Sequence, residues 1–120
     1  MKKLILALSG SMLMVVGSFA QAADLAAGQA AFSKFTCSAC HGADAKTTTS
    51  PAYPILAGQH EDYLRHALTA YKRGQSGAPA TANIRKNAIM GAMASSLSDA
   101  DMSNIAAWLS SLPTPLTIQK

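Results

Sequence analysis

Apolar residues recur at helical spacing in three segments of the chain, and no segment alternates in the manner of a β-strand. The last segment has the clearest pattern, because residues 98–101 (Ser-Asp-Ala-Asp) resemble a capping box and Pro113 stops the helix. Its apolar face, with Trp108 on the flank, consists of Met102, Ile105, Ala106, Leu109 and Leu112. This pattern predicts a helix with one buried face near the end of the chain.

Two earlier segments also predict helices. Asp24 is a good N-cap for a helix over residues 25–34, where Gly28 suggests that another element crosses close by. A further helix is expected over residues 60–73, with acidic residues in its first turn, basic residues in its last and Gly74 as terminator. The apolar stripe expected to be buried on this helix is Tyr63, Leu64, Ala67, Leu68 and Tyr71.

The connecting segments have weaker patterns. Residues 43–54 are rich in Thr, Ser and Pro, and residues 75–83 are rich in Gly, Ala and Pro, so both are expected to be loops. Residues 84–94 are expected to hold a short helix and a turn that carries Met90 and Met93. With no strand pattern and no internal repeat, the sequence predicts a small all-α domain with three main helices and long loops.

The first 22 residues have a different pattern, which predicts a secretory signal peptide. Lys2 and Lys3 form a basic start, residues 4–19 are mostly apolar, and residues 20–22 (Ala-Gln-Ala) match an A-x-A cleavage site. A retained membrane anchor is the alternative, but the apolar stretch is short for a membrane span. We therefore expect a signal peptide over residues 1–22, a mature domain over residues 23–120 and export to the periplasm.

The charge of the chain gives no reason to expect a nucleic-acid partner. The formal net charge is +4, from 10 basic and 6 acidic residues. Removing Lys2 and Lys3 with the leader leaves 8 basic against 6 acidic residues, or +2. A mature domain of this size struggles to build a sufficient core from side chains alone, so a buried cofactor would help to complete it.

The candidate for chemistry is the segment Cys37-Ser-Ala-Cys40-His41. C-x-x-C-H is the attachment signal of c-type haem. Two thiols on one side of a helical turn can form thioethers with the two vinyl groups of one haem, and the histidine places a ring nitrogen under the iron. Three alternatives are open: a thioredoxin-type redox pair, which wants a βαβ context; a zinc site, which wants a fourth ligand; and a disulfide that would close a very short loop.

A second axial ligand would decide the function of such a haem. An open position allows ligand binding or peroxide chemistry, whereas a filled position favours electron transfer. The candidates are Met90, Met93, Met102, His60 and His66. We expect Met102 in a helix core and both histidines at the surface, whereas Met90 and Met93 are harder to explain by packing. A thioether opposite an imidazole raises the reduction potential.

Together these motifs resemble the class I c-type cytochromes, and the chain is similar to the single-haem c553 type and to one half of the di-haem cytochrome c4 family. The resemblance covers nearly the whole mature chain. The matching segments, in family order, are residues 28–32, 37–42, 51–59, 63–64, 90–93 and 97–99.

The resemblance implies a role for each matching residue. Cys37 and Cys40 would hold one haem c through thioethers, and His41 would be the proximal iron ligand. The Pro54 carbonyl would accept a hydrogen bond from the other ring nitrogen of His41. Met90 would be the distal ligand, with Met93 as the alternative.

The resemblance also implies how the helices meet. Gly28 and Phe32 would contact Trp108 where the first and last helices cross. The cytochrome c4 pattern continues into a second haem domain, whereas one haem is expected for this chain.

The expected function is that of a soluble periplasmic mono-haem cytochrome, which is not an enzyme. It would shuttle single electrons by Fe(III)/Fe(II) cycling, as a monomer in transient contact with membrane complexes. Its partners would be redox proteins: a quinol-oxidising complex, and a terminal oxidase, reductase or peroxidase. A basic docking rim is expected at Lys72, Arg73, Arg85 and Lys86. The alternatives are a haem sensor or small peroxidase-like enzyme with an open sixth position, or the cytochrome subunit of a periplasmic dehydrogenase.

Overall fold

The structure is a computed structural model that describes residues 22–114. Its elements are α1 (Leu25–Lys34), α2 (Ser38–His41), α3 (Glu61–Gln75), the 3₁₀ turn η1 (Ala80–Ala82), α4 (Ala88–Ser95) and α5 (Asp99–Ser111). No strand is present in this part of the chain, so the prediction of a small all-α fold with three main helices is confirmed. The predicted signal peptide, apart from Ala22, lies outside the described residues.

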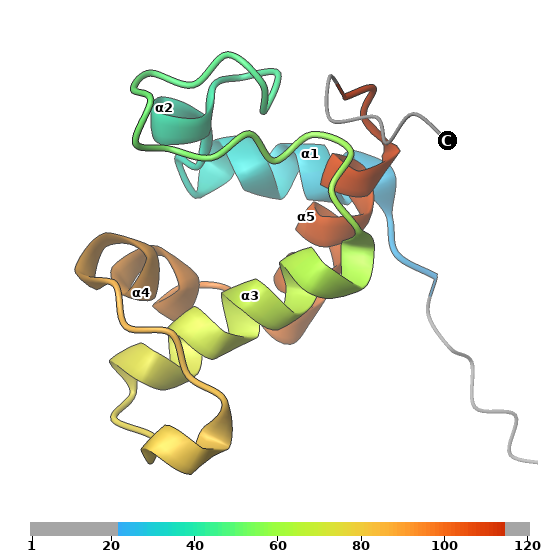
Figure 1. The fold of residues 1–120 in the computed structure, drawn as a ribbon. Coiled ribbons are helices and arrows are strands. Elements are labelled where there is room, and N and C mark those ends of the chain that lie inside the picture. Colours follow the sequence, from blue (N-terminus) through green and yellow to red (C-terminus); the bar gives the residue numbers. More distant parts are fainter. Residues whose placement is uncertain (1–21, 115–120) are drawn as a thin grey trace, which may run out of the picture.

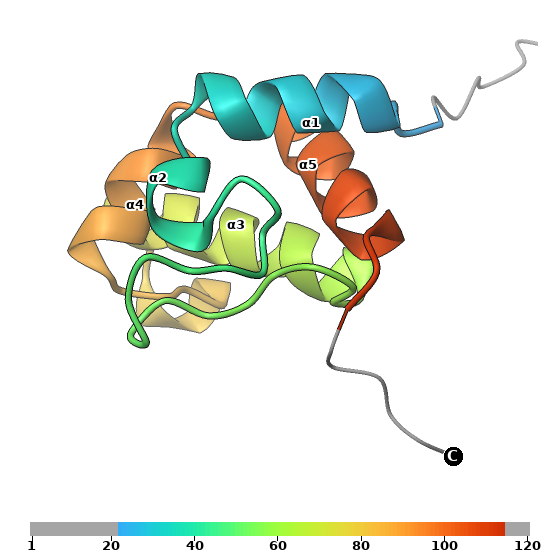
Figure 2. The same ribbon diagram turned by 90° about the horizontal axis from the view of Figure 1, so that it is seen from above.

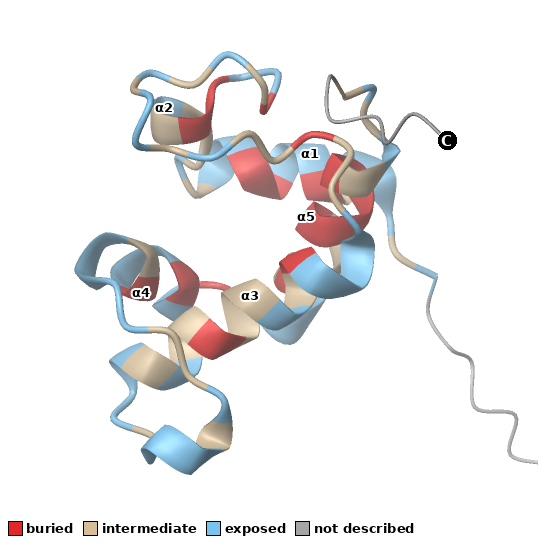
Figure 3. Cartoon of the chain, in the orientation of Figure 1, coloured by how far each residue is buried: buried red, intermediate tan, exposed pale blue. Residues whose placement is uncertain are grey.

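The helices of the described chain mark two ends of the molecule, which α3 connects. α1 crosses α5 at one end, α2 and α4 lie at the other end, and α3 runs from beside α5 to beside α4, as both Figure 1 and Figure 2 show. Figure 3 shows that α5 carries much of the buried surface and that shorter buried segments lie on each of the other helices. α5 is therefore the centre of the apolar core. Within residues 22–114, no helix is both long enough and apolar enough to cross a membrane.

The first and last helices, α1 and α5, begin where their local sequences predict. The Asp24 carboxylate accepts a hydrogen bond from the Ala27 amide at 3.0 Å and caps α1. The Ser98 hydroxyl accepts from the Asp101 amide at 3.1 Å, and the Asp101 carboxylate accepts from the Ser98 amide at 2.9 Å. This is the expected capping box, and such caps contribute about 1 kcal/mol each.

The crossing of α1 and α5 explains the glycine inside α1. A Cβ at Gly28 would lie 2.1 Å from the carbonyl oxygen of Asn104 and 2.8 Å from Cβ of Trp108. The rings of Phe32 and Trp108 pack beside this point with centroids 5.0 Å apart. The side chain of Asn104 also accepts a hydrogen bond from the Asp24 amide at 2.9 Å. The predicted contact of Gly28 and Phe32 with Trp108 is therefore confirmed.

The end of α3 differs from the sequence prediction. Gly74 is not a terminator but lies inside α3, which continues to Gln75. The reason is a contact from outside the helix: a Cβ at Gly74 would lie 2.1 Å from the carbonyl oxygen of Arg85. The glycine allows the chain before α4 to approach the α3 backbone.

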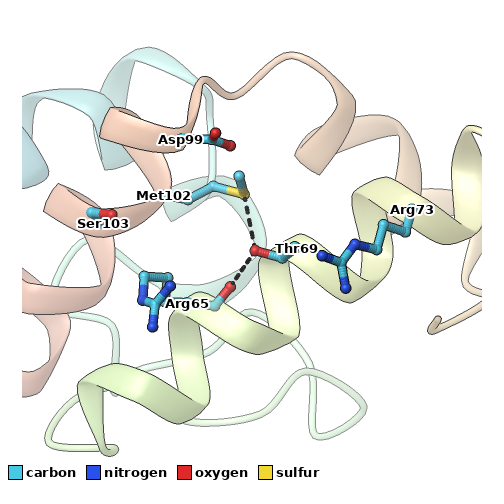
Figure 4. A pocket seen from close by; sticks show the side chains of 6 residues that line it. All are labelled: Arg65, Thr69, Arg73, Asp99, Met102 and Ser103. Carbon is cyan, nitrogen blue, oxygen red and sulfur yellow. Dashed lines mark hydrogen bonds between the residues drawn. The ribbon is translucent and has the colours of Figure 1, made fainter. Parts of the chain in front are cut away.

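The predicted buried stripe of α3 is wrong at Tyr63. Its side chain is 48% exposed and lies under the guanidinium of Arg85, not in the core. Leu64 and Ala70 are the buried residues of α3. Deeper in the contact with α5, the Thr69 hydroxyl donates to the Arg65 carbonyl oxygen at 2.9 Å and points at Sδ of Met102, 3.9 Å away (Figure 4).

Helix α4 also corrects a prediction. Met90 and Met93 lie on a continuous helix and not in a turn, because Asn87 caps it: its Oδ1 accepts from the Ile89 amide at 3.1 Å and from the Met90 amide at 2.9 Å. The helix packs against α3, where Gly91 fits closely against Gln75. Both methionines thus belong to one rigid element.

Candidate functional site

The end of α1 sets the position of the Cys-x-x-Cys-His segment. The amide of Phe35 still donates to the Ala31 carbonyl oxygen at 2.9 Å, but Thr36 then adopts a φ of 58°. This left-handed conformation reverses the chain, and the Cys37 amide donates back to the Phe32 carbonyl oxygen at 3.1 Å. Left-handed backbone at a β-branched residue costs on the order of 1 kcal/mol, so the surrounding contacts must hold the reversal in place.

Helix α2 gathers the three chemically active side chains on a single turn. The His41 amide donates to the Cys37 carbonyl oxygen at 3.1 Å, and Cys40 lies between them. Both cysteines are half-buried free thiols, and Cys37 packs against the apolar core. Burial raises the pKa of the Cys37 thiol, so this group stays protonated at neutral pH. His41 is 6% exposed, which makes it the buried polar side chain of the described residues.

The ring of His41 is oriented by the loop between α2 and α3. Its Nδ1 lies 3.0 Å from the carbonyl oxygen of Pro54. A carbonyl oxygen only accepts, so Nδ1 carries the proton and donates, and a neutral ring then has its lone pair on Nε2. The Tyr53 ring packs against the imidazole with centroids 6.1 Å apart. This arrangement fixes both the tautomer and the tilt of a histidine that ligates a metal through Nε2.

The first part of the loop between His41 and Pro54 is shaped by local hydrogen bonds and by a glycine. Gly42 has a φ of 81°, and a Cβ there would lie 2.2 Å from the Thr47 carbonyl oxygen. The Asp44 carboxylate accepts from the amides of Lys46 and Thr47 at 2.9 and 2.7 Å and from the Thr47 hydroxyl at 2.8 Å. These bonds lower the pKa of Asp44 to about 2.

The far part of the loop is fastened to the core. The carbonyl oxygen of the fully buried Ala45 accepts from the amides of Leu56 and Ala57 at 3.0 and 3.1 Å. The Thr49 amide donates to the Cys40 carbonyl oxygen at 3.1 Å. The loop therefore returns to the same turn that it leaves, which brings the Pro54 carbonyl beside His41.

The candidate distal ligands lie on α4, which is at the same end of the molecule as α2 in both views and below it in Figure 1. Met90 is half-buried and Met93 is 39% exposed. The other candidates behave as expected: Met102 is 2% exposed in the core, and His60 and His66 are exposed. The two methionines on α4 are therefore the thioethers that lie on the same side of the molecule as the cysteine–histidine turn.

The residues of this site fit haem c better than the alternatives. Two free thiols and an imidazole with Nε2 available share one turn, and Cys37 and the nearby Phe35 pack against the apolar core. Within residues 22–114, no three His, Cys, Asp or Glu side chains form a group that could hold a metal ion, so a zinc site has no support. No strand flanks the motif in the described chain, which removes the context of a thioredoxin-type pair.

Comparisons with known proteins agree with this geometry. The sequence model of the family Cytochrome c matches residues 25–113. Cytochrome c-554(548) of Halomonas halodenitrificans is 43% identical over 93 residues, which cover 75% of this chain and 98% of that protein. The crystal structure of reduced recombinant cytochrome c4 from Pseudomonas stutzeri has a TM-score of 0.66 at 42% identity, over 77% of this chain and 47% of that one.

A third relative bears a functional name. The protein named thiosulfate dehydrogenase electron acceptor, of Stutzerimonas stutzeri, is 34% identical over 119 residues, which cover 96% of this chain and 51% of that protein. This chain thus spans nearly all of the c-554(548) relative but about half of the cytochrome c4 and electron-acceptor relatives.

The chain belongs to the cytochrome c family. Members of this family bind covalently attached haem c with its iron and transfer electrons between redox partners. The cysteines that such attachment requires are present here as Cys37 and Cys40.

The expected basic docking rim is not a set of freely solvated charges. Lys72 donates through Nζ to the Leu97 carbonyl oxygen, Arg73 donates through Nη1 to the Ala82 carbonyl oxygen at 3.2 Å, and Arg85 lies over Tyr63. Lys86 alone of the four has no such contact among those described and is exposed. Gly74 is the sequence signal that could have revealed the approach of Arg85 to α3. A glycine inside a helix marks a close backbone contact here, as Gly28 does where α1 crosses α5.

Proposed function

We propose that the chain is a mono-haem electron carrier of the periplasm in which His41 and Met90 are the axial ligands of the iron. The observation that carries the proposal is the buried imidazole of His41, whose Nδ1 is held by the Pro54 carbonyl oxygen at 3.0 Å. A carrier needs its ligands held in place in both oxidation states, so that little rearrangement accompanies the electron.

The residues of the chain have separate tasks in this function. Cys37 and Cys40 would hold the haem by thioether bonds, and the bound group supplies one-electron Fe(III)/Fe(II) chemistry. Hydrogen bonding to Pro54 keeps the Nε2 of His41 directed and basic. The neutral Met90 thioether would favour the reduced state more than a second imidazole does.

Location and partners belong to the proposal as well. The leader pattern over residues 1–22 supports export, and covalent haem in bacteria is attached outside the cytoplasmic membrane. The relative named thiosulfate dehydrogenase electron acceptor supports a redox enzyme as donor, and a quinol-oxidising complex is the other candidate. The acceptor would be a terminal oxidase, reductase or peroxidase.

Replacement of Met90 tests the ligand set. In Met90→Ala, the charge-transfer absorption of the methionine–iron bond in the oxidised protein should disappear from the red part of the spectrum. The reduced variant should bind carbon monoxide readily, because the sixth position is open. The matched control is Met93→Ala, one turn further along α4, which should keep the wild-type spectrum.

The reverse result would assign the ligand to Met93. A wild-type protein that lacks the band and binds carbon monoxide readily would exclude the carrier and favour a sensor or peroxidase-like enzyme with an open position.

A further inference from the structure

The connection from α3 to α4 is fixed to α3 by a side chain that the electron-transfer site does not itself use. Nη2 of Arg85 donates to the hydroxyl of Tyr63 at 3.2 Å. The guanidinium carbon lies 5.2 Å from the Tyr63 ring centroid and 5.6 Å from that of Tyr71. The two tyrosines are about two helical turns apart on α3, so the single Arg85 side chain contacts two successive turns of this helix.

The backbone of the same residue is also held. The Arg85 amide donates to the Ala70 carbonyl oxygen at 3.0 Å, and its own carbonyl oxygen occupies the space that a side chain at Gly74 would need. The side chain, amide and carbonyl of Arg85 therefore all contact α3, between Tyr63 and Gly74.

The next element along the chain is α4. Lys86 separates Arg85 from Asn87, whose side chain caps α4 and binds the Met90 amide at 2.9 Å. At the other end of α4, Lys72 donates to the Leu97 carbonyl oxygen. Among the described helices, α4 has its main packing contact with α3. A shift of Arg85 relative to α3 would therefore move Asn87, two residues further on, and with it the start of α4 and Met90.

We propose that Arg85 is a positioning residue that sets where α4, and with it the Met90 thioether, lies relative to α2. This inference rests on the proposed function, because it takes a methionine of α4 as the distal ligand. Two stacking contacts and a charge-assisted hydrogen bond together correspond to about a tenfold change in an equilibrium constant. Loss of the guanidinium should raise the population with a displaced α4 by about that factor.

The test compares Arg85→Leu, Arg85→Lys and the control Lys86→Leu in the haem-loaded protein. Arg85→Leu should weaken the methionine–iron band, increase carbon monoxide binding about tenfold and speed hydrogen exchange at the Met90 amide, at a temperature where the fold is intact. Arg85→Lys should restore part of the band, of the low carbon monoxide binding and of the slow exchange. An ammonium also interacts with a tyrosine ring but lacks the planar set of donors of a guanidinium. The control removes an adjacent positive charge and should match the wild type.

Two outcomes separate a positioning role from a purely structural one, and a third tests the ligand assignment on which the inference rests. A wild-type band, carbon monoxide rate and Met90 exchange in Arg85→Leu, with only a lower melting temperature, would show that Arg85 merely stabilises the fold. If that variant does not fold, Tyr63→Phe removes the hydroxyl acceptor alone and must show the same changes in weaker form; their absence overturns the proposal. A band that survives in both Met90→Ala and Met93→Ala would instead refute the ligand assignment, whereas exchange at the Met90 amide would still report on Arg85.

Discussion

At the scale of single residues, the site depends on contacts between near neighbours in the sequence. Cys37, Cys40 and His41 share one turn, and for this reason a five-residue pattern was enough to locate them. The bond from His41 to Pro54 spans 13 residues and was expected only from the resemblance to known cytochromes. Spacing alone could not have predicted it, because it requires the folded loop between the two residues.

Asp44 makes that loop sensitive to acid. Its pKa of about 2 lies below that of an unfolded aspartate, about 4, so its stabilising effect is present above pH 4 and is lost as the pH falls through 2. In a series of thermal melts from neutral pH down to pH 2, Asp44→Asn should therefore lose less stability than the wild type. Glu61→Gln, at another exposed carboxylate, is the control. Identical acid profiles for Asp44→Asn and wild type would show that Asp44 does not cause the acid sensitivity.

At the scale of helices, sequence-based prediction succeeds where a helix is capped by its own residues. It fails where a residue distant in the sequence contacts the helix. α1 and α5 were predicted well, since Asp24 and Ser98 cap them within their own first turns. The errors at Gly74 and Tyr63 share one cause, the approach of Arg85 from the far end of a loop. No periodicity within α3 records that approach.

The crossing of α1 and α5 gives a prediction at this scale. Gly28→Leu should destabilise the protein by roughly 2 kcal/mol or more, because even its Cβ would meet the Asn104 backbone 2.1 Å away. Ala26→Leu places the same side chain at an exposed position of α1 and should change stability little. Chemical denaturation of the two variants and the wild type measures the difference. Equal midpoints would mean that the helices can separate at this point without cost.

At the scale of the whole molecule, the boundary between leader and domain can be tested. The Asp24 amide is bound to Asn104, so the described fold is fastened to α5 two residues after the expected cleavage site. We predict that the exported protein begins at Ala23 and unfolds with the same midpoint as the uncleaved chain. Mass spectrometry of the exported protein and parallel denaturation curves check the two statements. A mass that retains residues 1–22 would favour the membrane anchor.

The pair α1 and α5 lies at one end of the molecule and the pair α2 and α4 at the other. This arrangement determines where a fusion partner or a surface can be attached. The described chain enters at α1 and leaves after α5, on the side away from α2 and α4 (Figures 1 and 2). A fusion partner or an electrode linker joined just before α1 or just after α5 would therefore lie on the opposite side of the molecule from α2, with the cysteine–histidine turn, and α4, with Met90.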